Sequence, residues 1–160
     1  MIRFLALLSL AIWLGAIFFF ALMAPTVFAV LPTNHQLAGE IISPLLEKLH
    51  WVGASCGVLF LILSMTSNQL RTGAIRPFRT SHLLVTAMLG LLAISQFGLA
   101  PRMLAMRNQM VVIDNVPKDD PVRVAFNDLH HWSTRLEGTV FVLGLGVLYI
   151  TSRRLGARRE

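Results

Sequence analysis

Charge is the property that this sequence has least of. Lys, Arg, Asp and Glu make up 14% of its 160 residues, whereas soluble domains carry about 25%. The charges that are present gather between long apolar runs. Apolar and aromatic residues reach 55%, and the mean hydropathy is +0.66. This composition excludes a soluble globular enzyme and a disordered chain, and it indicates an integral membrane protein.

Cysteine and the common catalytic motifs are missing as well. Cys56 is the one cysteine in the sequence, which excludes an intrachain disulfide scaffold. No Walker loop, nucleophile elbow, dinucleotide fingerprint or catalytic-triad spacing occurs. The sequence therefore gives no argument for an enzyme, and it specifies the membrane topology far better than the biochemical role.

Four stretches are long and apolar enough to cross a bilayer, which requires about 20 helical residues. We expect spans at about 4–31, 44–67, 82–100 and 121–152, within a single domain of residues 1–160. Ser43-Pro44 and Asp120-Pro121 each pair a capping residue with a proline suited to the first helical position. The first run is about twice as long as the core of a signal peptide, so we expect it to be retained. The predicted fold is an all-α, four-helix bundle in the membrane.

Basic residues are divided unevenly between the two sides of these spans. The side with both termini and the loop after the second span carries eight arginines and one acid, and the other side carries six bases and seven acids. Because cytoplasmic segments are enriched in Lys and Arg, we predict that both termini are cytoplasmic, in a bacterial-type inner membrane. The lipid bilayer is the predicted partner, with Arg153, Arg154, Arg158 and Arg159 beside anionic headgroups. A nucleic-acid partner is not expected.

Small residues are placed where helices in lipid need close contact. Helices in a bilayer associate by close backbone approach at Gly, Ala and Ser. The glycines that we expect at helix contacts are Gly15, Gly53, Gly57, Gly138 and Gly144. The Gly53-x-x-x-Gly57 spacing favours packing within the bundle over a homodimer.

Glu137 is the most informative polar residue. The uncharged part of the fourth span, Gly138–Ser152, is 15 residues, or about 22 Å, so Glu137 must lie below the membrane interface. A carboxylate there is expected to face the bundle interior or a water-filled cleft. The helical repeat places His130 and Ser133 on the same face.

A second polar face lies at the outer end of the second span. Glu47 and His50 are three residues apart and share this face. We predict that the two faces meet in one outer polar pocket, with candidate residues His50, His130, Ser133, Glu137 and Glu47.

Three interpretations of this pocket remain open. It closes the top of the bundle through bonds from Arg135 or a histidine; it holds a metal or haem; or it relays protons or ions through Glu137 and His130. In the metal interpretation His50 and His130 supply imidazole ligands. Met103, Met106 and Met110 add thioethers that would suit Cu(I), so copper or haem is the candidate cofactor.

Two functional classes follow from these interpretations. A binding or transport protein would hold a metal, haem or small cation in the outer pocket. A structural or accessory subunit would instead use its glycine faces and outer loop to support a larger membrane complex. The partner of such a subunit would be another membrane protein or a second copy of the chain.

Several motifs resemble the transmembrane protein 205-like family, long described as a domain of unknown function. The likeness covers about residues 13–137. It is carried by Trp13-Leu14-Gly15, Phe18-Phe19-Phe20, Ala24-Pro25, Phe28, Ala38-Gly39, Pro44, Pro101-Arg102 through Arg107, Phe126, Leu129-His130, Ser133 and Leu136. This resemblance implies a four-span membrane protein without an agreed activity.

The chain departs from that family at two places. Glu137 stands where the family often has asparagine, and Ser43-Pro44-Leu45-Leu46-Glu47 lacks the usual aromatic residues. A more distant likeness to copper-resistance D-type membrane proteins favours the metal or haem interpretation by fold analogy alone.

Overall fold

A computed structural model describes residues 1–72, 79–110 and 112–156 of the chain. Its elements in order are α1 (Ile2–Val30), α2 (His35–Thr72), α3 (Thr80–Ala93), the π-helical segment η1 (Ile94–Leu99), α4 (Ala100–Met110), the short 3₁₀ helix η2 (Ile113–Asn115) and α5 (Pro121–Gly156). No strand occurs within those described ranges. The predicted all-α class is confirmed.

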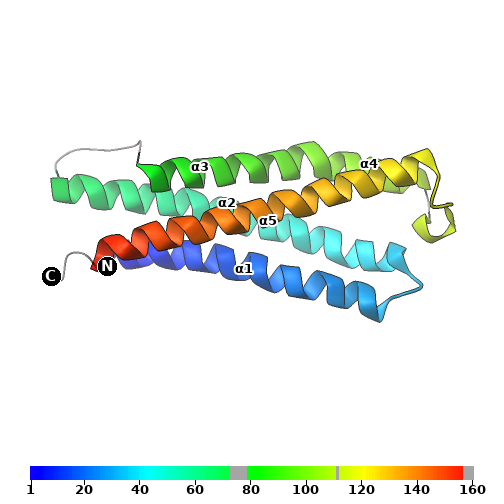
Figure 1. Cartoon of the computed structure of the whole chain (residues 1–160), viewed down its shortest axis with the longest axis horizontal. Helices are drawn as coiled ribbons and strands as arrows, with labels where there is room; N and C mark the ends of the chain where they lie inside the picture. Colours follow the sequence, from blue (N-terminus) through cyan, green and yellow to red (C-terminus); the bar gives the residue numbers. More distant parts are fainter. Residues whose placement is uncertain (73–78, 111, 157–160) are drawn as a thin grey trace.

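The helices form an elongated antiparallel bundle (Figure 1). Contacts join α1 to α2, α2 to α3, α3 to α5 and α5 to α1, so α2 and α5 are diagonal partners across the bundle. Helix α1 begins and α5 ends at the same end of the molecule (Figure 1). Four segments are long and apolar enough to cross a membrane, namely Ile2–Val30, His35–Leu70, Thr80–Met110 and Pro121–Arg153. The prediction of a four-helix membrane protein is therefore confirmed.

The core is built around Trp13, which is 1% exposed. A Cβ atom at Gly53 would collide with the Trp13 indole, and one at Gly57 would lie 2.9 Å from it. A Cβ at Gly144 would likewise collide with Leu14. Glycine at these positions lets the helices approach closely, because lipid supplies no hydrophobic force of its own between helices.

Two of the glycines expected at helix contacts lie in open space. At Gly15 and Gly138 an added Cβ would meet nothing within 4 Å, whereas Gly53, Gly57 and Gly144 make the close contacts given above.

Helix α2 begins at His35, upstream of the expected start at Pro44. The side chain of Asn34 accepts a hydrogen bond from the N–H of Leu37 at 2.9 Å, which is N-capping geometry. The carboxylate of Asp114, from η2, accepts the N–H groups of His35 at 3.2 Å and Gln36 at 3.1 Å. Pro44 is consequently an internal residue of α2, because the helix is capped from a segment distant in sequence.

The third span continues past Pro101 instead of ending at Ala100. Directly before this proline the chain forms the π segment η1, in which the N–H of Ala100 donates to the carbonyl of Ser95. A π turn admits one extra residue and is frequent at functional positions. Here it changes which side chains of the third span face the bundle interior.

Candidate polar site inside the bundle

A hydrogen bond between a histidine and a glutamate crosses the diagonal of the bundle. Nε2 of His50, on α2, lies 2.6 Å from Oε1 of Glu137, on α5. The side chain of His50 is 2% exposed and that of Glu137 is 17% exposed. Two ionisable groups are therefore held in direct contact within a predominantly apolar interior.

Gln96, on the π segment η1, completes the network. Nδ1 of His50 lies 2.6 Å from Oε1 of Gln96. Because an amide oxygen only accepts hydrogen bonds, Nδ1 carries a proton and donates it to Gln96. The remaining ring nitrogen, Nε2, faces Glu137.

This arrangement assigns one shared proton to the His50–Glu137 bond. The proton lies either on Nε2, which gives an imidazolium beside a carboxylate, or on Oε1, which gives a neutral imidazole beside a carboxylic acid. The pair is neutral overall in both forms. Loss or gain of a further proton would leave a net charge in the interior, where desolvation makes an unpaired charge costly.

The three residues lie near the middle of their helices. His50, Gln96 and Glu137 are close to the midpoints of the apolar segments His35–Leu70, Thr80–Met110 and Pro121–Arg153. The sequence placed the polar pocket at the outer end of the bundle. In the structure the network lies deeper along the helices, about 24 Å from the start of α5.

Other residues predicted for this pocket are arranged differently. Ser133 is 6% exposed and lies one helical turn before Glu137 on the same face of α5. Glu47 is exposed, and His130 is exposed with its ring 6.4 Å from that of His131. Neither of these two side chains forms a hydrogen bond or ion pair with His50. The structure thus joins His50 to Glu137, with Ser133 beside them.

The predicted metal ligands do not gather into one group. Among the described residues, no set of three or more His, Cys, Asp or Glu side chains could hold a metal ion. Met103, Met106 and Met110 follow one another along α4, where Met110 is buried.

Of the two partners considered for closing the bundle, Arg135 or a histidine, Glu137 is bonded to the histidine His50. Arg135 stacks on Trp132, with its guanidinium carbon 5.4 Å from the ring centroid.

Gln96 is the site residue that sequence reasoning did not find. The available signal was Ser95-Gln96, a polar pair in the middle of an apolar span, and polar residues in such positions usually hydrogen-bond across helices. A regular helix repeat does not predict its direction, because the π segment begins two residues earlier and alters the register. Ser95 is also buried, at 1% exposure.

The fold and this network define an integral membrane protein with a polar centre inside an apolar four-helix bundle. Residues 8–111 match the family described as Domain of unknown function (DUF4149). Since the match covers more than half of the chain, the protein belongs to this family. The matched region contains His50 and Gln96 and ends before α5. A search of curated proteins finds no match, and neither does a search of solved structures.

Proposed function

We propose that this protein binds a proton inside the membrane and relays it through the His50–Glu137 pair. The observation that carries the proposal is the 2.6 Å contact between Nε2 and Oε1 across the bundle. Ionisable residues inside a membrane are rare and costly, and those that face the bundle interior and pair with one another mark proton and ion pathways. Gln96 orients the imidazole so that Nε2 is the exchanging nitrogen.

The face of α5 suggests the route to the outer surface. His130, Ser133 and Glu137 follow at three- and four-residue steps, so they share a face. His130 is exposed and Ser133 is buried. In the proposed relay the pair first lacks its shared proton, so that Glu137 is a carboxylate beside a neutral imidazole. A proton enters beside His130, passes Ser133 with water and becomes the shared proton between Oε1 of Glu137 and Nε2 of His50, and it leaves by the same route. This route accounts for a carboxyl group that is 17% exposed next to an imidazole that is 2% exposed.

Infrared spectroscopy of the reconstituted protein tests the proposal. We expect the spectrum to contain a carboxylic acid band whose intensity changes with pH and which is lost in Glu137→Gln. In His50→Gln the carboxyl group loses its partner, so the pH at which the band changes should move. Glu47→Gln is the matched control, because Glu47 is an exposed carboxylate one turn before His50 on α2, and it should leave the band unaltered.

A structural role gives a different result in the same experiment. If Glu137 keeps one protonation state over the whole pH range in which the protein stays folded, the pair only closes the bundle. Loss of the band in Glu47→Gln together with its persistence in Glu137→Gln would also reject the proposed site.

We also propose that both termini are cytoplasmic in a bacterial-type inner membrane, as the distribution of arginine favours. A reporter fused after Glu160 should then be active in the cytoplasm, and activity of an exported reporter would contradict this orientation. The likeness to the transmembrane protein 205-like family, and more distantly to copper-resistance D-type membrane proteins, belongs to the same set of proposals. The histidine–serine motif of the fourth span supports the first of them.

A further inference from the structure

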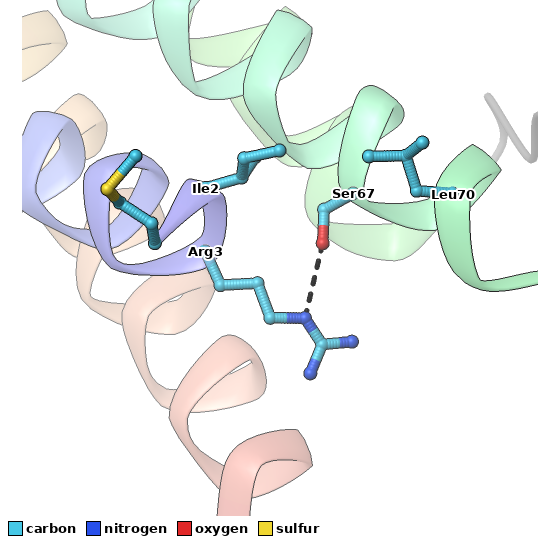
Figure 2. Close-up of a pocket in the computed structure, with 5 residues that line it drawn as sticks. Ile2, Arg3, Ser67 and Leu70 are labelled. Carbon is cyan, nitrogen blue, oxygen red and sulfur yellow. Dashed lines mark hydrogen bonds between the residues drawn. The ribbon is translucent and has the colours of Figure 1, made fainter.

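A second polar feature lies far from the His50–Glu137 pair, at the end of the bundle where α1 begins. Arg3, in the first turn of α1, lines an open cavity of about 520 Å³ together with Met1, Ile2, Ser67 and Leu70. Figure 2 shows the Arg3 side chain reaching from α1 to Ser67 on α2. Nε of Arg3 donates to Oγ of Ser67 at 3.2 Å, which fixes the direction of the guanidinium.

The guanidinium of Arg3 keeps donors for a ligand. Its two terminal Nη groups form no hydrogen bond with the described residues, and they point away from Ser67 (Figure 2). No described carboxylate pairs with Arg3, because the acids in those ranges lie on the first half of α2, near η2 and the start of α5, and at Glu137. A half-buried, planar guanidinium without a carboxylate partner fits an anion that accepts two parallel hydrogen bonds, such as a phosphate group.

The charge of the surrounding end of the bundle has the same sign. Arg79, before α3, and Arg153, near the end of α5, lie at this end too. Arg79 donates to the side-chain oxygen of Asn68, and Arg153 lies over the ring of Tyr149 at 5.7 Å. Their positive potential favours an anion at Arg3, while their own contacts hold them outside the cavity lining.

The apolar neighbours of Arg3 favour a lipid over a free anion. Met1 is 98% exposed and Leu70 is 72% exposed, and both line the cavity. A free phosphate would leave these side chains in water, whereas the glycerol and the first acyl carbons of a phospholipid would cover them. The position of Arg3 along α1 also suits a lipid headgroup. Helix α1 is about 43 Å long and exceeds a hydrocarbon core of about 30 Å by several ångströms at each end, so its first turn lies at the level of the headgroups.

We propose that this cavity binds the phosphate of an anionic phospholipid, with the Nη groups of Arg3 as donors. The apolar side chains of Met1 and Leu70 contact the part of the lipid next to its headgroup. This site is independent of the proton site, since the two involve different residues at different depths of the bundle.

Native mass spectrometry of the full-length protein in detergent tests this site. The probes are phosphatidylglycerol, phosphatidylcholine and inorganic phosphate. We expect wild-type protein to retain one phosphatidylglycerol more tightly than phosphatidylcholine, and Arg3→Gln to weaken that binding about tenfold. Arg153→Gln is the matched control, because it removes one arginine from the same end outside the cavity; we expect a change of less than about twofold.

Three outcomes would overturn the proposal. Equal losses in Arg3→Gln and Arg153→Gln would indicate a diffuse charge effect without a site. Equal retention of phosphatidylcholine would remove the role of headgroup charge. Displacement of the lipid by inorganic phosphate would show a free-anion site. Should Arg3→Gln not fold, Arg3→Lys and Arg153→Lys replace the pair, since lysine keeps the charge but lacks the planar fork; equal affinities in those two variants would also contradict the site.

Discussion

At the scale of single residues, the bundle depends on glycines that face a rigid side chain. Gly53 lies against the indole of Trp13, which is itself 1% exposed. An indole buried this completely has no free space into which it can turn. Adding even one methyl group at Gly53 should therefore lower the stability of the fold.

We predict that Gly53→Ala destabilises the protein by about 1–3 kcal/mol through overpacking. Reversible unfolding in mixed micelles would measure the change. Gly138→Ala is the control, since an added Cβ there meets nothing within 4 Å and alanine is the better helix former. Equal destabilisation in the two variants would mean that Trp13 does not pack on Gly53.

The contacts of His50 could be predicted from the sequence only in part. The sequence predicted that polar faces of the second and fourth spans meet, and His50 and Glu137 do form a hydrogen bond. It also grouped His130 with them, but that side chain is exposed. A helical repeat predicts which residues share a face. It does not predict which of these residues lies at the depth where a neighbouring helix comes into contact.

At the scale of elements, distant segments determine where helices begin and how they face. The spacing of apolar residues was sufficient to predict four spans. The start of α2 was not predictable in this way, because Asp114 supplies part of its cap from 79 residues downstream of His35. The orientation of the Gln96 side chain could not be predicted from the sequence either, because it depends on a π segment inside the third span.

The contact between η2 and α2 leads to a prediction on pH. Partial desolvation acts to raise the pKa of Asp114, but hydrogen bonds from the N–H of Gln36 and from the ring and N–H of His35 hold it below its usual value. A carboxyl group with a lowered pKa stabilises the fold fully above its ordinary pKa of about 3.9, and this contribution is lost as the pH falls through the lowered value.

We therefore expect the protection factors of the first N–H groups of α2, taken relative to the intrinsic exchange rate at each pH, to stay constant down to about pH 4 and to fall in stronger acid. Asp114→Asn should lower these protection factors already at neutral pH, by the loss of about 1 kcal/mol of capping. Asp119→Asn removes an exposed carboxylate of the same loop and should behave as wild type. Unchanged exchange in Asp114→Asn would show that this cap contributes nothing in solution.

At the scale of the whole molecule, one diagonal contact joins helices that are not neighbours around the bundle. The helices adjacent around the bundle pack through apolar side chains and glycine and through polar contacts such as Arg3–Ser67 and His50–Gln96. The diagonal helices α2 and α5 are connected through the interior by His50 and Glu137. Burying such a pair is costly unless both partners are present, and removing one partner leaves the other unsatisfied. The pair is therefore expected to act as one unit in stability as well as in proton binding.

A double-mutant cycle on unfolding in the bilayer, with His50→Leu, Glu137→Leu and the double variant, tests this claim most directly. We expect each single variant to be destabilised by about 3 kcal/mol. The double variant should be more stable than the sum of the two losses implies, by at least about 1 kcal/mol. Losses that add within about 0.5 kcal/mol would contradict the contact on which the proposed proton site depends.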